Sequence, residues 1–281
     1  QMTSFYLFVL RFFSRITYIL KNNLNYPFNK IWSLIYLLLP KNRTFIRTIN
    51  NHRIIKVTKD HQQTLYATGK SGLHISDFIG NIDYPFIFID IGANHGIYTL
   101  DAHNNSFLIN SHSIEPNPES FKYLLDNIKF NSIKSSYFYN LALSIRNEKV
   151  LLTIHPWHSG LSNISGRGGE RRIYVEAKNH SLFDDIFLKN RNCFYVIKCD
   201  TEGLEAVVIR NLINSKISKF ISALIIEITP EWLSSEDKQM IINDLSAMGF
   251  KTLKLKEVIN AKKQKDLIFT KEIFLNQLKN S

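Results

Sequence analysis

The feature that most constrains the fold is a set of continuous apolar runs, each ending in an acidic residue. The clearest are PFIFID at 85–90, CFYVIKCD at 193–200 and ALIIEI at 223–228. Such runs are typical of strands that are buried on both faces of a parallel sheet. Helix-like stretches separate them, and repeated β–α units predict a mostly parallel sheet with helices on both faces. The sequence therefore predicts an α/β fold.

The remaining elements follow from local signals. Asn117 is predicted to cap a helix that begins at Pro118, with Glu119 favourable to the helix dipole. A second helix is expected to begin at Ile97, after a glycine-rich turn. The other expected elements are strands at 112–116, 135–143, 250–255 and 266–271, a hairpin formed by 150–158 and 171–177, and a helix at 202–212.

The positive charge lies mostly at the N-terminus. Residues 1–60 contain ten Lys or Arg side chains and one acid, a net charge of +9, whereas the whole chain carries +11 and the rest only +2. Apolar runs at 5–20 and 31–39 are rich in aromatics, but a spanning helix needs about 20 mostly apolar residues and neither run supplies them. We therefore divide the chain into a basic, aromatic-rich helical segment at 1–60 and a main domain at 61–281.

Two interpretations of residues 1–40 remain open from the sequence. An interfacial amphipathic helix would bring its arginines to an anionic membrane surface. Alternatively, the same apolar faces would pack on the domain or form a homodimer contact. A nucleic-acid partner is not expected, because the body is nearly neutral and shows no basic stripe.

Cys193 and Cys199 are expected to remain reduced. If they lie on one strand, six residues separate them by roughly 20 Å. A disulfide requires Cα atoms about 4.4–6.8 Å apart, so the two thiols cannot pair within the chain. Reduced cysteines favour a cytoplasmic location. If residues 1–40 bind a membrane, the protein would be peripheral on its cytoplasmic face.

The turn after the first apolar run indicates the class of cofactor. A dinucleotide fold places glycines where the pyrophosphate presses against the backbone, but Asn94 occupies one of those positions. Asp90 would also repel a diphosphate and favour an ammonium group or water. Glu115, at the end of the next strand, can accept hydrogen bonds from a ribose diol. These residues favour a nucleoside cofactor without phosphates, such as S-adenosyl-L-methionine.

The chain resembles the FkbM family of S-adenosylmethionine-dependent methyltransferases. The resemblance covers about 86–255 and implies a Rossmann-like class I methyltransferase sheet of seven strands. His95 departs from the usual pattern, and we expect its side chain to face solvent. The matching segments are FIDIGANHGIYTL (88–100), IEPNPESFKYLLDNIKFN (114–131), NLAL (140–143), IKCDTEGLE (197–205) and IIEITP (225–230).

The resemblance also implies roles for individual residues. It places Glu115 at the ribose, Asn117 beside the loop that follows, and Asn140 and Leu141 next to the adenine. The residues on the methionine side would be Asp90, Gly92, Asn94 and Gly96. The implied reaction is methyl transfer to a hydroxyl of a saccharide, glycolipid or secondary metabolite.

Candidates for the proton-accepting group lie in two places. Asp200 and Glu202 follow a strand that points at the cofactor, where they would act as base or orient the acceptor; the alternative is that they cap the next helix. His155 and His158 lie in the predicted hairpin, and either could be the base or an ordinary loop residue. A His-x-x-His pair without a third ligand is weak evidence for metal, so we predict no metal site.

Two other classes of function compete with an O-methyltransferase. One is a non-catalytic module that keeps the cofactor fold, and the intact motifs from Asp90 to Glu205 argue against it. The other is methylation of nucleic acid, which would require a basic surface over the catalytic face.

Overall fold

The computed structural model describes residues 45–55, 61–67, 69–155, 159–164, 166, 171–187, 193–250 and 257–271. The predicted apolar helices at 5–20 and 31–39 lie outside these residues. So do His158 and most of the strand expected at 250–255. Among the helices of the described residues, none is both long and apolar enough to cross a membrane.

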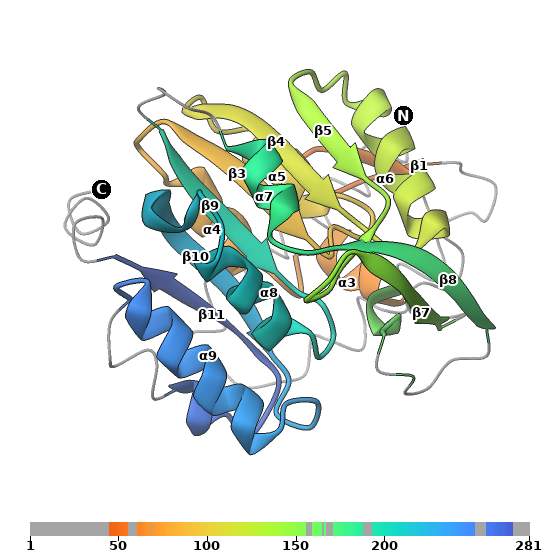
Figure 1. The fold of residues 1–281 in the computed structure, drawn as a ribbon. Coiled ribbons are helices and arrows are strands. Elements are labelled where there is room, and N and C mark those ends of the chain that lie inside the picture. The colour runs from red at the N-terminus through yellow and green to blue at the C-terminus, as the bar shows by residue number, and fades with distance from the viewer. Residues whose placement is uncertain are drawn as a thin grey trace, which may run out of the picture.

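A central six-stranded sheet has the order β11-β10-β9-β3-β4-β5 (Figure 1). Five strands run parallel, and β11 pairs antiparallel with β10. This confirms the predicted α/β fold with a mostly parallel sheet. At the predicted seventh strand, the described residue Phe250 forms an isolated bridge with Lys271. The strands are β3 (Phe86–Ile91), β4 (Leu108–Ile114), β5 (Ser136–Tyr139), β9 (Phe194–Cys199), β10 (Ile221–Ile228) and β11 (Lys265–Thr270).

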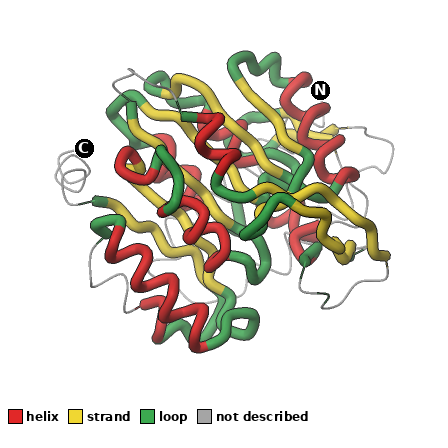
Figure 2. Tube along the Cα trace, in the orientation of Figure 1, coloured by secondary structure: helices red, strands yellow, loops and turns green. Residues whose placement is uncertain are grey.

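Helices cover both faces of this sheet (Figure 2). Every residue of β3 and β10 is buried, as their continuous apolar sequences predict. Alternate side chains of β3 pack into different clusters, Phe86 and Phe88 with α4 and α5, and Ile87 and Ile89 with α7, α8 and α9. The helices are α3 (His61–Ala67), α4 (Leu73–Gly80), α5 (Ile97–Ala102), α6 (Pro118–Phe130), α7 (Ser181–Ile186), α8 (Glu205–Ile213) and α9 (Ser235–Ala247).

A second, three-stranded sheet lies beside the carboxyl ends of the central strands. Its order is β6-β8-β7, formed by β6 (Ala142–Leu143), β7 (Glu148–Ile154) and β8 (Arg171–Lys178). The antiparallel pairing of β7 with β8 confirms the predicted hairpin. A short 3-10 helix, Ser159–Leu161, lies between these two strands in the sequence.

The strand expected at 135–143 is instead divided between the two sheets. β5 ends at Tyr139 and β6 begins at Ala142. The cause is Asn140, whose side-chain amide donates hydrogen bonds to the carbonyl oxygens of Glu115 and Pro116 at 2.8 and 3.2 Å. These bonds tie the chain to the end of β4, so it cannot continue along the central sheet.

Residues 45–55 form an antiparallel hairpin rather than the helix expected through residue 60. β1 (Phe45–Arg47) pairs with β2 (Arg53–Ile55). The hairpin is held on α6 by side-chain amides, because Asn127 and Asn131 accept hydrogen bonds from the backbone N–H groups of Ile55 and Arg53 at 2.7 and 2.9 Å. This part of the N-terminal segment therefore belongs to the folded domain.

Candidate active site

The loops after β3 and β9 touch at Gly92. This glycine has φ 73°, a conformation that favours glycine, and a methyl group added to it would overlap the carbonyl oxygen of Asp200. The backbone N–H of Asp200 also donates to the carbonyl oxygen of Ile91 at 3.1 Å. Glycine at this position therefore brings Asp200 next to the turn that was predicted to bind the cofactor.

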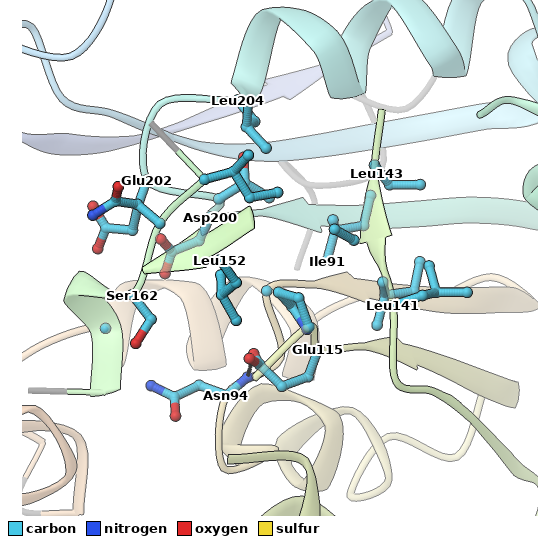
Figure 3. A pocket seen from close by; sticks show the side chains of 18 of the residues that line it. Ile91, Asn94, Glu115, Leu141, Leu143, Leu152, Ser162, Asp200, Glu202 and Leu204 are labelled. Carbon is cyan, nitrogen blue, oxygen red and sulfur yellow. Dashed lines mark hydrogen bonds between the residues drawn. The ribbon is translucent and has the colours of Figure 1, made fainter. Parts of the chain in front are cut away.

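Asn94 connects this turn to two other segments (Figure 3). Its backbone N–H donates to Glu115 Oε2 at 2.8 Å, and its side-chain Nδ2 donates to Ser159 Oγ at 2.8 Å. Its Oδ1 atom is buried and has no hydrogen-bond partner among the described residues. A buried acceptor without a partner is costly, so this oxygen is suited to a donor on a bound molecule.

Glu115 stands at the carboxyl end of β4. Its two carboxylate oxygens accept one backbone N–H each, from Asn94 and Asn117, both at 2.8 Å. Burial raises the pKa of Glu115 to about 7, although these hydrogen bonds act in the opposite direction. Asn117 caps α6 as predicted, because its side-chain oxygen accepts the N–H of Glu119 at 3.0 Å. Each oxygen of Glu115 keeps acceptor capacity for a ligand hydroxyl.

The structure places two predicted cofactor residues behind the turn rather than at a pocket wall. Gly96 is the N-cap of α5, and a methyl group added there would overlap the side chain of Leu124. Asp90 is fully buried, accepts a hydrogen bond from Thr99 Oγ1 at 2.8 Å and lies 3.6 Å from Lys198 Nζ. Both residues therefore stabilise the turn and are not among the described residues that line the pocket.

A pocket with about 620 Å³ of empty space opens at this edge of the sheet. That space includes the part of the pocket that is open to solvent. Among the described residues that line it there is no Lys, Arg or His, although it contains three acids. Figure 3 shows Asp200 and Glu202 toward one end and Leu141 and Leu143 toward the other. The principal lining residues are Ile91, Gly92, Asn94, Ile114, Glu115, Leu141, Leu143, Leu152, Ser159, Ser162, Asp200 and Glu202.

Lys198 is a functional candidate that the sequence reasoning missed. Its buried ammonium group lies 3.2 Å from Asp200 and 3.6 Å from Asp90, and it donates to the carbonyl oxygen of Gly92 at 3.0 Å. Burial alone would lower the pKa of Lys198, but the two carboxylates raise it, so the group stays charged. The signal in the sequence was a single lysine inside the apolar run at 193–200, which is otherwise unfavourable in a buried strand.

Three carboxyl groups gather at the ends of β9 and β10. Carboxylate oxygens of Asp200, Glu202 and Glu227 all lie within 4.8 Å of one another. Burial and the neighbouring carboxylates raise the pKa of Glu202 to about 9 and that of Glu227 to about 11. The cluster therefore holds protons at neutral pH. Its oxygens could also coordinate a divalent cation, and the expectation of no metal site stays a prediction.

Asp200 and Glu202 do not cap the next helix. α8 begins at Glu205, three residues later than the expected 202, and its N-cap Leu204 makes no side-chain capping bond. Glu202 has φ 53° and Gly203 φ 103°, so the chain turns away from a helix there. The carboxylate of Glu205 accepts the N–H groups of Thr201 and Gly203 instead.

The histidine candidates are less well placed. The backbone N–H of His155 contacts Ser162 Oγ at 3.4 Å, and His155 is not among the described residues lining the pocket. His158 lies outside the described residues. His95 was expected to face solvent but is buried, with its ring 5.3 Å from that of Tyr123.

Residues 90–252 match the family described as the methyltransferase FkbM domain, which is more than half of the chain. The chain belongs to the FkbM methyltransferase family. This confirms the resemblance proposed from the motifs, and it makes the protein a methyltransferase. No curated protein matches the chain.

Solved methyltransferases resemble this FkbM protein at low identity. A methyltransferase FkbM from Methylobacillus flagellatus KT is 15% identical over 76% of this chain and 55% of that chain, with a TM-score of 0.42. Trm5b from Pyrococcus abyssi is 12% identical over 83% and 56%, with a TM-score of 0.43. Precorrin-6y C5,15-methyltransferase from Geobacter metallireducens GS-15 is 12% identical over 63% and 70%, with a TM-score of 0.36.

Proposed function

We infer that the protein is an S-adenosyl-L-methionine-dependent O-methyltransferase that modifies a hydroxyl of a saccharide, glycolipid or secondary metabolite. The observation that carries the cofactor assignment is the chemistry of the large pocket. Its described lining offers carboxylates and a buried amide oxygen but no basic side chain. Among these described residues a phosphate would find no cation, whereas a ligand with an ammonium and a sulfonium group is favoured.

The residues of this pocket fit the parts of that cofactor. Glu115 retains acceptor capacity for the two ribose hydroxyls. The unpartnered Oδ1 of Asn94 can accept a hydrogen bond from the ammonium group of the methionine portion. Leu141, Leu143 and Leu152 provide apolar surface for the adenine ring.

The cofactor, when bound, supplies a methyl group on a positively charged sulfur that leaves as a neutral thioether. The protein must hold the acceptor oxygen in line with that methyl group and remove its proton. We assign both tasks to Asp200, and support comes from its place in the pocket lining and from Lys198 Nζ, which lies 3.2 Å from its carboxylate. Glu227, on the neighbouring strand β10, has a carboxyl oxygen within 4.8 Å of that of Asp200, and its raised pKa leaves it a proton to donate.

Isothermal titration with S-adenosyl-L-methionine and S-adenosylhomocysteine tests the cofactor assignment, with NAD⁺ as the diphosphate control. Both S-adenosyl ligands, the sulfonium and its thioether product, should bind and NAD⁺ should not. Absence of binding at millimolar S-adenosyl-L-methionine would refute the assignment. Binding without transfer to any extracted glycan or lipid would instead favour the non-catalytic module.

The same proposal places the protein at the cytoplasmic face of a membrane, through residues 1–40. Support comes from the +9 charge of residues 1–60 and from the aromatic-rich runs described above. This segment lies outside the described residues, and its attachment is tested separately below.

A further inference from the structure

A second pocket is also lined by Asp200. Its empty space, including the part open to solvent, is about 400 Å³. α3 contributes Gln63 and Tyr66 to its lining, and α5 contributes Ile97 and Tyr98. It is thus formed on the α3–α5 side of the site, and we call it the α3–α5 pocket.

The two pockets share three lining residues. Asn94, Gly160 and Asp200 belong to the walls of both. Methyl transfer needs the donor and the acceptor on opposite sides of one reacting centre, next to the group that takes the proton. Asp200 has this position, since it lies where the cofactor pocket and the α3–α5 pocket meet.

The lining of the α3–α5 pocket is aromatic and polar but electrically balanced. The rings of Tyr66 and Tyr98 meet edge to face, with centroids 5.6 Å apart and planes at 75°. Its one lysine, Lys198, is compensated by Asp200 and by the buried Asp90. Aromatic surface next to a few amide and carboxylate groups suits a ring that carries several hydroxyls. The phosphate of a phosphorylated ligand would find Lys198 already paired with these two carboxylates.

We propose that the α3–α5 pocket binds the acceptor and that the acceptor is an uncharged sugar residue. This inference rests on the proposed O-methyltransferase function and adds the place and class of the substrate. Gln63 and Tyr66 precede residues 90–252, the part of the chain that matches the family. Helix α3, which lies outside the matched region, would therefore contribute to the choice of acceptor.

Two substitutions in the α3–α5 pocket test the proposal. Ile97→Trp would fill the pocket, and Tyr66→Leu would remove an aromatic wall from a half-buried position. Leu141→Trp is the matched control, because it adds the same side chain to the cofactor pocket. Ile145→Trp adds it to the surface at a residue that is 62% exposed.

The protein, loaded with S-adenosylhomocysteine, is probed by saturation-transfer NMR. The probes are methyl glycosides of glucose, galactose, mannose, rhamnose and N-acetylglucosamine, with glucose 6-phosphate and glucosamine as charged comparisons. At least one uncharged glycoside should bind more tightly than both charged sugars. Ile97→Trp and Tyr66→Leu should weaken that binding about tenfold and leave cofactor affinity within about twofold. Ile145→Trp should change neither, and Leu141→Trp should lose the cofactor.

Calorimetry with S-adenosyl-L-methionine on the same samples separates the two claims. If the wild type does not bind this cofactor, the proposed function itself fails. If it does bind, three results overturn the inference alone: no uncharged glycoside binds, a charged sugar binds as tightly, or glycoside binding persists in both pocket variants.

Discussion

At the scale of single residues, the site depends on one buried cation. Lys198 forms ion pairs with Asp90 and Asp200 and donates a hydrogen bond to the carbonyl oxygen of Gly92. Breaking a buried ion pair from one side is costly, because the remaining charges keep their desolvation penalty. The lysine therefore connects the stability of the domain to the geometry of the site.

Lys198→Met should lower the free energy of unfolding by about 3–5 kcal/mol at neutral pH. The loss should shrink toward about pH 4, where carboxylates of unfolded chains also take up protons. Urea denaturation of wild type and variant at several pH values measures this loss in the free energy of unfolding. Lys129→Met, at an exposed position in the last turn of α6, is the control and should change little. A loss under about 1 kcal/mol for Lys198→Met would contradict the pairing described here.

If Glu115 binds the ribose as proposed, cofactor affinity should depend on pH. Because burial raises its pKa to about 7, the free protein holds this group partly protonated at neutral pH. The ionised form is the better acceptor for ribose hydroxyls, so affinity for S-adenosylhomocysteine should rise between about pH 6 and pH 8, by up to about tenfold. Glu115→Gln should remove that dependence, and Glu115→Ala should weaken binding by about 1–3 kcal/mol. Calorimetric profiles that run parallel in wild type and Glu115→Gln would exclude the ribose role.

Glu227 should reduce stability as pH rises. Burial and nearby carboxylates raise its pKa to about 11, far above the ordinary value, so the folded state binds a proton that the unfolded state releases. Stability is therefore lost as pH increases from about 4.5 upward. Glu227→Gln keeps a donor for Asp200 and an acceptor for Gln264, which now donates to Glu227 at 2.6 Å. The free energy of unfolding of the variant should exceed that of the wild type, and this difference should grow by up to about 1 kcal/mol per pH unit above pH 6. A difference independent of pH would show that Glu227 is ionised in the folded protein.

At the scale of elements, the contact between the loops after β3 and β9 determines where Asp200 lies. Gly92→Ala would place a methyl group against the Asp200 carbonyl oxygen and would also strain a left-handed residue. Gly249→Ala is the matched control, since Gly249 has φ 85° but open space around an added methyl group. Gly249→Ala should cost about 1 kcal/mol, the usual penalty of that conformation. Thermal unfolding should show a clearly larger loss for Gly92→Ala; equal losses would mean that the loops can separate freely.

The elements differ in how well the sequence predicts them. The buried strands at 86–91, 194–199 and 221–228 are recognisable because burial on both faces requires continuous apolar residues. The division of 135–143 depends on hydrogen bonds from Asn140 to residues far away in the sequence, which no local pattern reveals. The seven-residue α3 is too short for a clear helical period, so its contribution to the site could not be predicted.

Within the site, the types of the functional residues were more predictable than the positions of their side chains. Asn94, Glu115, Leu141, Asp200 and Glu202 line one pocket, as their positions after strands indicate. Asp90 and Gly96 have the expected residue types but lie beneath the turn, because strand pleating and helix packing decide which side chains face a ligand.

At the scale of the whole molecule, the charge is divided unevenly along the chain. Residues 1–60 carry +9 and the remainder +2. Each basic residue near an anionic membrane contributes about 1 kcal/mol, whereas a nearly neutral catalytic body is not attracted. The N-terminal segment is therefore the part of the chain expected to determine membrane attachment.

The full chain should sediment with anionic vesicles and be released by salt, because the Debye length falls from about 10 Å at 0.1 M to about 3 Å at 1 M. Deletion of residues 2–40 should abolish sedimentation and preserve cofactor binding, since the described hairpin begins only at Phe45. Vesicles of phosphatidylcholine with and without phosphatidylserine provide the comparison. If the full chain stays in the supernatant, or the truncated form no longer folds, the segment packs on the domain or forms a dimer contact.

The position of α3 in the chain has a consequence for relatives of this protein. The described residues that line the proposed cofactor pocket all lie within 90–252, whereas Gln63 and Tyr66 come from an earlier stretch outside the part that matches the family. Two homologues could therefore inherit the same donor machinery and still methylate different molecules. Assigning substrates across such a lineage would require comparing the short helix ahead of the first central strand, and exchanging that helix between homologues would be a direct way to redirect the enzyme.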